Sequence, residues 1–390
     1  MNACKTFKTG LFRELKRMVS RPVYLVIMIV IPLISFLFFA SFMPEGLPKD
    51  LPIGIIDHDN SVLSRKIARQ IEVSQENKIY KHYSNFSEAR ADMQRGKIFA
   101  FAEIPADLEK KVLSNRQPTI YFYYHQTYLI SGSLVLKDLS SVLATTSAGI
   151  NLKTRQAMGQ RTEESMSQVL PIVPEIHAIG NPETNYSIYL INVTIPGMLQ
   201  LMVLLTTVFA IGTELKESSA LIWLQQSGNS IFTALTTKLL PYTFGFGAMG
   251  IFSDILLFKI LHYPLHTNIL WMFCATFLMV LSAQAIGIFM IGVFPVLRDG
   301  LSFAGLFGML SFSYSGLSFP IEGMPALLQS LSFLFPLRHF FRIYQILALN
   351  GFPLRIAFPY FLWLAAFMLL PFIVLVRLRK ALIFQNYPKK

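Results

Sequence analysis

The sequence predicts an α-helical polytopic membrane protein with six spans, a re-entrant hairpin before the last span, and an inserted extracytoplasmic α/β domain that continues into a long helical segment. Hydrophobic residue types make up 53% of the 390 residues and charged types 14%, whereas a soluble domain carries about 25% charged residues. Six apolar segments reach the roughly 20 residues that a helix needs to cross a bilayer. The long segment between the first two has the strand and helix patterns of a soluble fold.

The predicted spans lie at residues 22–42, 188–212, 241–261, 268–294, 301–319 and 356–376. The first is too long for the core of a signal peptide and lacks a small-residue cleavage site before Met43. An even number of spans places both termini on one side of the membrane. Basic residues are abundant at both termini and in the loops on that side, so the positive-inside rule makes it the cytoplasmic side. Residues 43–187 are then outside, and the net charge of +12 reflects orientation rather than nucleic-acid binding.

Strands and helices alternate in the outside segment, which predicts a small open α/β sheet. We expect strands at 52–56, 79–83, 98–104 and 119–124, helices at 61–71, 87–95 and 105–113, and a long helix or helical pair over 130–168. Ser87 is the expected cap of the second helix. The aromatic residues of 120–128 fit either a path for an amphipathic solute or a strand packed on both faces.

Asp57, His58 and Asp59 invite a metal or catalytic interpretation. We favour a strand-to-helix turn in which the carboxylates cap backbone N–H groups, because no second cluster of metal-ligand residues has suitable spacing. The sequence contains no Walker, GxGxxG, GxSxG or HExxH pattern. No catalytic, metal or cofactor site is therefore expected on this chain, and any energy input must come from another chain.

Two segments on the cytoplasmic side are predicted to form amphipathic surface helices. In residues 5–19, four apolar residues fall on one face: Phe7, Leu11, Leu15 and Met18. The loop at 213–238 has apolar residues at helical spacing and a break at Ser227-Gly228-Asn229. Glu214, Glu217 and Trp223 would suit docking of a basic, grooved partner; alternatively, the carboxylates only end a span and face water.

Residues 319–325 (FPIEGMP) interrupt an apolar run, which indicates either the turn of a re-entrant pair or a plain external loop. Arg338, His339 and Arg342 follow in another apolar stretch, where lipid phosphate or Glu322 would compensate their charge. Asp254 lies within the third predicted span, and Lys259 is its expected partner.

Four stretches of the chain resemble the type-2 ABC exporter permeases, a family common in bacteria, and their order covers nearly the whole length. They are PIGIIDHDNSVLSRKIARQI, GNPETNYSIYLINVTIPG, ELKESSALIWLQQSG with KLLPY, and GLSFPIEGMPALLQSLSFLFPLRHFFRIYQILALNG. In the family the third stretch often begins Glu-Arg-Glu and has a Thr-Pro turn. Here it reads Glu214-Leu215-Lys216-Glu217 and Gln226-Ser227.

The resemblance implies a domain order along the chain. It begins with a cytoplasmic amphipathic interface helix (1–21) and the first transmembrane helix (22–42). An extracytoplasmic α/β domain with a helical stalk (43–187) follows. Transmembrane helices two to six (188–380) and a cytoplasmic tail (381–390) complete the chain. A coupling loop (213–238) and a re-entrant region (319–351) lie within the fourth part. The implied location is the bacterial inner membrane, with both termini cytoplasmic.

The resemblance also implies that the chain is a permease subunit of an ATP-driven exporter and forms the translocation pathway for a hydrophobic or amphipathic substrate such as a drug or lipid. The implied pathway lies between the second and fifth spans of two subunits. ATP and Mg²⁺ would be bound by separate ATPase subunits. Other implied partners are a second or sister permease, membrane lipids, and a periplasmic adaptor with an outer-membrane channel. The implied ATPase-coupling residues are Glu214, Glu217, Trp223, Leu224 and Lys238. The implied pathway residues are Pro320, Glu322, Pro325, Arg338 and Arg342. The alternative from another class is a non-transporting receptor or scaffold that displays an α/β binding module.

Overall fold

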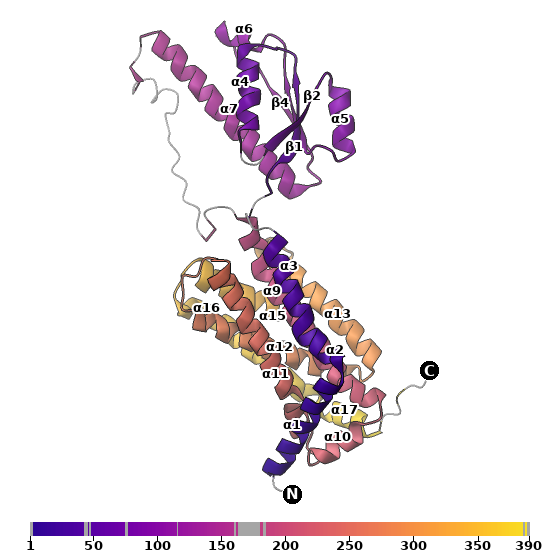
Figure 1. Cartoon of the computed structure of the whole chain (residues 1–390). Helices are drawn as coiled ribbons and strands as arrows, with labels where there is room; N and C mark the ends of the chain where they lie inside the picture. The colour runs from indigo at the N-terminus through magenta and orange to yellow at the C-terminus, as the bar shows by residue number, and fades with distance from the viewer. Residues whose placement is uncertain are drawn as a thin grey trace. The chain divides into compact units, whose positions relative to one another are not determined.

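The computed structural model describes residues 3–42, 46, 48–74, 77–114, 116–159, 161–162, 180–181, 185–384 and 387 (Figure 1). The chain divides into two compact units. The first combines Met1–Gly46 with Ala178–Lys390, and the second is Leu47–His177. The second unit is the sheet domain, and it follows the first candidate membrane span in the sequence.

The second unit contains a mixed four-stranded sheet of order β2-β1-β3-β4. Its strands are β1 (Leu51–Asp57), β2 (Asn77–Tyr83), β3 (Ala100–Ile104) and β4 (Tyr121–Tyr124). β1 pairs in parallel with β2 and β3, whereas β4 pairs antiparallel with β3. The parallel pairs need crossover helices, which the alternating sequence pattern predicts. The expected small α/β sheet is confirmed.

The helices of this unit cover both faces of the sheet. They are α4 (Val62–Glu72), α5 (Phe86–Gln94), α6 (Leu108–Leu113) and α7 (Leu129–Ala157). α4, α6 and α7 pack over the face that carries Ile53 and Ile55, and α5 packs over the face that carries Ile56. Alternate residues of β1 thus enter two separate apolar cores, as the two-residue period of a strand requires.

Short polar side chains fix where these helices begin. The Asp57 carboxylate accepts hydrogen bonds from the backbone N–H groups of Asp59 and Asn60 at 3.0 Å and from the Ser64 hydroxyl at 2.7 Å. Asp59 accepts from the backbone N–H groups of Leu108 and Glu109, so it caps α6. The capping interpretation is therefore confirmed.

The cap of α5 differs from the prediction. Asn85 accepts the hydrogen bond from the backbone N–H of Glu88 at 2.9 Å, and Ser87 lies inside the helix. The sequence SNFSEA offers several short polar side chains, and Asn85 is the one placed three residues before Glu88.

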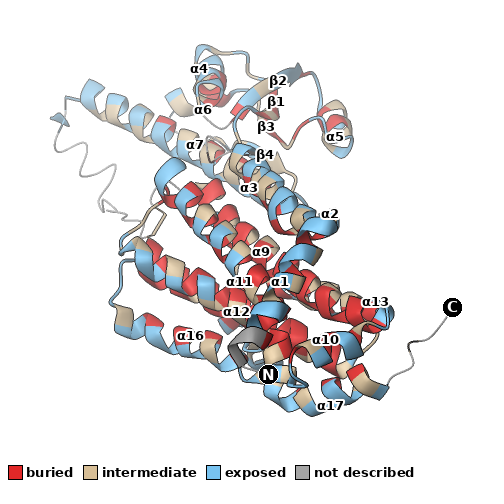
Figure 2. Ribbon diagram, turned by 60° about the horizontal axis from the view of Figure 1, so that its bottom comes forward, coloured by how far each residue is buried: buried red, intermediate tan, exposed pale blue. Residues whose placement is uncertain are grey.

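Five helices of the described residues are long and apolar enough to cross a membrane: Pro22–Ser41, Tyr186–Lys216, Ile231–Ile260, Ile269–Val293 and Leu354–Phe384. They comprise α2 (Pro22–Leu25) with α3 (Ile31–Phe42), α9 (Tyr186–Lys216), α11 (Ile231–Ile255), α12 (Ile269–Val293), and α16 (Leu354–Phe367) with α17 (Leu370–Phe384). α9 is the most enclosed of them and packs against α12, α13 and α3. Figure 2 shows α9 largely buried, whereas α2 and α16 expose apolar residues, as lipid-facing helices do.

The predicted span at 301–319 is not among these five helices. The helix in this region, α13, runs from Leu297 to Ser313 and has 17 residues, which correspond to about 25 Å against a hydrocarbon core of about 30 Å. The chain then turns through Gly316 in the left-handed region, at φ +92°. The apolar composition of 314–319 therefore concealed a turn.

Several shorter helices complete the first unit. They are α1 (Ala3–Ser20), α10 (Ala220–Gln226), α14 (Ala326–Ser332) and α15 (Pro336–Ile343). α10 ends where predicted, because Gly228 and Asn229 take positive φ angles of 68° and 59°. The last long helix is interrupted between α16 and α17, just before Pro371, which has no N–H to continue the ladder. The Ser282 hydroxyl on α12 donates to the Leu364 carbonyl at 2.7 Å, next to this interruption.

Candidate functional site

Charged residues of α1 converge on α9 and α11. α1 packs along α11, and Arg13, Glu14 and Arg17 share one side of it because residues three or four apart are neighbours on a helix. Phe12 and Val19 on α1 are more than 70% exposed. The predicted apolar face is divided: Met18 is buried and Leu11 half-buried, whereas Phe7 and Leu15 are exposed.

Glu214 is the centre of this cluster. It lies two residues before the end of α9, and its side chain is fully buried. The carboxylate accepts hydrogen bonds from Arg13 at 3.0 Å and Lys238 at 2.9 Å, and also from Arg17 and the Ser219 hydroxyl. It thus links α1, α9 and α11 to the start of α10.

Lys238 is a second buried charge in this cluster, and its side chain is also fully enclosed. Its ammonium group donates to Glu14 at 2.8 Å as well as to Glu214, and it lies 5.0 Å from the centre of the Trp223 ring. The Tyr242 hydroxyl, one turn further along α11, donates to Glu14 at 2.8 Å. Every carboxylate in this interior thus has a cation or hydroxyl partner, which is the condition under which buried charges are tolerated.

Glu217 forms the solvent-exposed edge of the cluster. Both of its carboxylate oxygens accept hydrogen bonds from Arg21, at 2.7 and 2.8 Å, and Arg17 donates at 3.1 Å. The hydrogen bond from Arg21 holds the pKa of the Glu217 carboxyl below its usual range, although burial opposes this effect. Because the side chain is 39% exposed, the pair contributes little to stability compared with the buried charges.

The predicted coupling residues thus occupy two different environments. Trp223 and Leu224 are buried on the inner side of α10, and Glu214 and Lys238 meet inside the cluster. Glu217 is partly exposed, and the exposed apolar residues of α10 are Leu221 and Ile222. Glu214 and Trp223 therefore do not form an exposed docking patch, and the carboxylate of Glu214 does not face water.

Sequence analysis missed Arg13, Glu14, Arg17 and Tyr242 as members of the cluster. Glu14 is the only acidic residue before Glu45, and Lys238 is the only charged residue between Ile231 and Ser253. A single acid within the basic helix α1 and a single base within this apolar part of α11 are the signal from which this pairing was available.

The predicted pathway residues lie around the pair of short helices α14 and α15. Arg342 is 3.8 Å from Glu322, so one of the expected partners is present. Arg338 instead donates to the Ser332 hydroxyl, and its guanidinium lies 3.8 Å from the centre of the Phe333 ring. Pro320 and Pro325 flank the short 3₁₀ turn Ile321–Gly323 that contains Glu322.

Two other polar residues of the apolar regions find unexpected partners. His339 is fully buried, stacks on Trp363 at 5.6 Å between ring centroids, and shares a hydrogen bond of 2.9 Å with the Phe333 carbonyl. Asp254 accepts from the Thr276 hydroxyl at 2.8 Å, whereas Lys259, its predicted partner, is exposed. The prediction of an Asp254–Lys259 pair is wrong.

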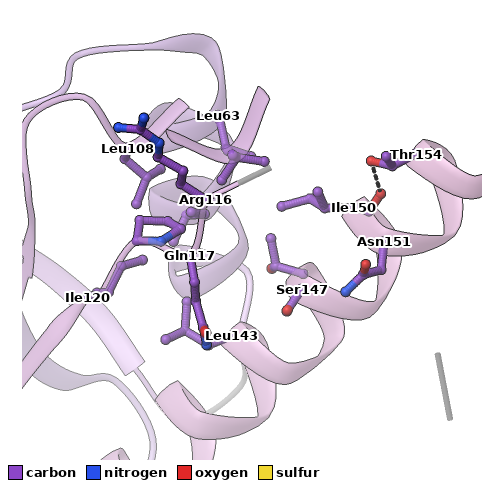
Figure 3. A pocket seen from close by; sticks show the side chains of 14 residues that line it. Leu63, Leu108, Arg116, Gln117, Ile120, Leu143, Ser147, Ile150, Asn151 and Thr154 are labelled. Carbon is purple, nitrogen blue, oxygen red and sulfur yellow. Dashed lines mark hydrogen bonds between the residues drawn. The ribbon is translucent and has the colours of Figure 1, made fainter. Parts of the chain in front are cut away.

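The second unit has a groove of about 510 Å³ bordered by α4, α6 and α7. Figure 3 shows Leu63, Leu108 and Leu143 around its floor and the Arg116 guanidinium at its edge. Ser147 and Asn151, on the same helix α7 as Leu143, lie across the groove from Leu108 and Arg116. The groove can therefore accommodate an apolar group together with a polar or anionic one.

The aromatic side chains of β4 do not line this groove. Phe122 and Tyr124 pack into one core of the sheet, and Tyr123 stacks on Phe101 in the other at 4.8 Å between centroids. The interpretation as a strand packed on both faces is confirmed. Within the part of the chain that the structure describes, no group of three or more His, Cys, Asp or Glu side chains is arranged to hold a metal ion.

Comparison with known proteins gives one family match. The model of the family described as "ABC-2 family transporter protein" matches residues 22–377, which includes all five candidate spans except the end of the last. A search of curated proteins found no match to the chain.

Proposed function

Since the chain belongs to the ABC-2 transporter family, we propose that it is the permease subunit of an ATP-driven exporter and forms the pathway for a hydrophobic or amphipathic substrate. It is a multi-pass membrane protein, and membrane subunits of this family lack nucleotide-binding motifs. ABC permeases pair with ATPase subunits, so ATP and Mg²⁺ belong to the partner. The match to a transporter family does not support the alternative of a non-transporting receptor.

The buried ion-pair cluster is the observation that carries the proposal. It ties α1 and α10, which lie at the ends of long helices, to α9 and α11 through Glu214 and Lys238. We propose that a force applied to α10 reaches these two candidate spans through the Ser219–Glu214 hydrogen bond and the contact of Trp223 with Lys238. We propose that an ATPase docks on the exposed side of α10, at Leu221 and Ile222, and that the buried coupling residues hold this surface in place.

The proposed topology has six spans, with α13 as a short fifth span and α14 with α15 as the re-entrant pair. This restores an even number of crossings, so that both termini are in the cytoplasm of a bacterial cell and the sheet domain is outside. α13 packs on α9 and exposes Phe303, Leu306 and Met309. We propose that this face, together with α9, meets a second or sister permease to enclose the pathway, with Glu322, Arg338 and Arg342 at its outer mouth.

The groove of the second unit supports an amphipathic cargo. Its apolar floor and the Arg116 cation at its edge suit a molecule with a hydrocarbon part and a polar or anionic part. We propose that cargo contacts this groove after leaving the membrane and is passed to a periplasmic adaptor and an outer-membrane channel.

The test is co-purification of the ATPase with permease variants. Leu221→Glu with Ile222→Glu places two carboxylates on the exposed side of α10, and we expect loss of ATPase binding and of export with normal amounts of permease in the membrane. Val62→Glu, at an apolar residue of the second unit that is more exposed than Leu221 and Ile222, is the control and is expected to leave ATPase binding unchanged. Full ATPase binding by the α10 double variant would show that the docking surface is elsewhere.

A further inference from the structure

An apolar groove lies between α11, α12 and the interrupted helix α16–α17, away from the ion-pair cluster. Its volume is about 560 Å³, which is within the range of about 300–1,000 Å³ typical of small-molecule sites. Leu239 and Phe244 line it from α11, Phe277 and Ile288 from α12, and Phe372 and Leu375 from α17. Nearly all of its surface is hydrocarbon, so in a bilayer it attracts an apolar occupant rather than water.

Arg379 places a cation on α17 beyond the end of the groove. Phe372, Leu375 and Arg379 are spaced by three and four residues, which places them on one face of the helix. The adjacent face, with Val374 and Leu378, is buried in the bundle, and α17 packs there on α12. Arg379 is exposed, and the described residues offer it no ion-pair partner. The groove therefore has an apolar body and a positively charged end.

The length of the groove is set by how α12 and α16–α17 align. Ser282 bonds to the carbonyl of Leu364, and Gly292 lies against the Val374 side chain, so the two helices keep the same offset at both points. Gln284 is therefore level with Ala366, and Arg379 lies about 13 residues, or about 20 Å, further along. Half of a hydrocarbon core is about 15 Å. A lipid with its headgroup at Arg379 would thus extend its tail to about 5 Å short of the level of Gln284.

We propose that this groove binds one anionic phospholipid, with its phosphate at Arg379 and one acyl chain along Leu375, Phe372 and Leu239. The occupant is an anionic lipid because the apolar body matches a hydrocarbon tail while the exposed guanidinium at its end matches a phosphate, a pairing favoured at the membrane surface. The site differs from the proposed translocation pathway, which uses α9 and α13. It does not depend on the proposed function, because binding to the permease alone is what defines it.

Gln284 provides a way to separate a plain tail from another ligand. Its side-chain oxygen accepts from the Thr243 hydroxyl at 2.8 Å, and its Nε2 has no partner among the described residues. The end of an acyl chain offers no acceptor to this amide. Gln284→Leu is therefore expected to keep or strengthen lipid binding, whereas a ligand with a deeply placed polar group would be lost.

The experiment is native mass spectrometry of the full-length permease after exchange with vesicles of equal parts palmitoyl-oleoyl phosphatidylglycerol and palmitoyl-oleoyl phosphatidylcholine. The expected wild-type result is one retained lipid, predominantly phosphatidylglycerol. Arg379→Ala should lower the preference for phosphatidylglycerol about fivefold, the effect of one cation near an anionic headgroup. Arg377→Ala is the matched control, because this exposed cation lies two residues away on a different face of α17.

A second pair of variants tests the apolar body. Thr236→Trp places a large ring at the lining of the groove and should displace both lipids, whereas Ile373→Trp, at an exposed residue outside the lining, should not. Unchanged lipid preference in Arg379→Ala, retention of lipid in Thr236→Trp, or loss of lipid in Gln284→Leu would each overturn the proposal. Disulfide cross-linking of two permeases through Thr236→Cys, in a chain whose two native cysteines are replaced, would show that a second copy covers the groove instead.

Discussion

Replacing Lys238 by methionine is the most direct test of the buried ion-pair cluster. The ammonium group is fully buried and donates to Glu14 at 2.8 Å and to Glu214 at 2.9 Å. Methionine fills a similar volume without the charge. Among the described residues, Glu14 then keeps only the Tyr242 hydroxyl as a partner, whereas Glu214 retains Arg13 and Arg17. The cost is therefore mainly one uncompensated buried carboxylate, about 3–5 kcal/mol.

This cost converts into a measurable shift of the thermal unfolding midpoint. At about 2 °C per kcal/mol for a domain of this size, Lys238→Met should lower the midpoint of the detergent-solubilised permease by about 6–10 °C. Trp223, 5.0 Å from the ammonium group, makes tryptophan fluorescence a suitable probe. Lys216→Met removes an exposed cation at the end of α9 and is the control, with an expected shift of about 1 °C.

A double variant separates loss of charge from loss of packing. Glu14→Gln with Lys238→Met removes both charges and keeps an acceptor for the Tyr242 hydroxyl, so it should recover about 1–3 kcal/mol relative to the sum of the single variants. The reasoning is refuted if Lys238→Met unfolds within about 2 °C of the wild type, or if the double variant shows no recovery.

Three further predictions concern stability. The pKa of the Glu217 carboxyl is depressed in the folded state, so its contribution to folding stability is present above the unfolded pKa and is lost as pH falls through the folded value. Glu217→Gln should therefore be less stable than the wild type above about pH 5. A stability difference that persists at low pH in unfolding scans would contradict this sign. Asp59→Ala removes the cap of α6 and should cost about 1 kcal/mol, seen as faster hydrogen exchange at Leu108 and Glu109, with no change expected for Asp50→Ala. Ser282→Ala leaves the Leu364 carbonyl without its hydroxyl donor and should cost about 1–3 kcal/mol in the unfolding midpoint, whereas Ser302→Ala on the exposed part of α13 should be neutral.

Local patterns allowed most of the sheet domain to be predicted. The strands and the helices α4, α5 and α6 differ from the expected ranges by a few residues, because alternation, helical spacing and turn residues act over short stretches. The long helix expected over 130–168 ends at Ala157, and residues 163–168 of that prediction lie outside the described residues. Asn85 and Ser87 are both suitable capping residues, and the sequence does not show at which of them the helical backbone begins. The end of α13 at Ser313 was missed for a related reason, since Phe312 to Phe319 is apolar enough for a span but contains a glycine-dependent turn.

The ion-pair cluster was harder to predict because its members come from three separate helices. Glu214 and Lys238 were identified as important, but their environment was assigned as an exposed surface. The sequence shows that Glu14 is the only acid in its stretch and Lys238 the only base in its own. It does not show that α1 and α11 lie side by side. Tertiary packing decides whether such charges face water or one another.

The distance along the chain between these partners has a consequence for biogenesis. Arg17 and Glu214 are separated by 197 residues, and Glu14 and Lys238 by 224. The ribosome must therefore synthesise the entire sheet domain before α1 can meet these partners on α9 and α11. At a synthesis rate of about 5–20 residues per second, the N-terminal helix waits on the order of 10–45 seconds with its charges unmatched. A nascent chain that has not yet reached α11 therefore lacks the Lys238 ammonium group that compensates Glu14 in the folded protein.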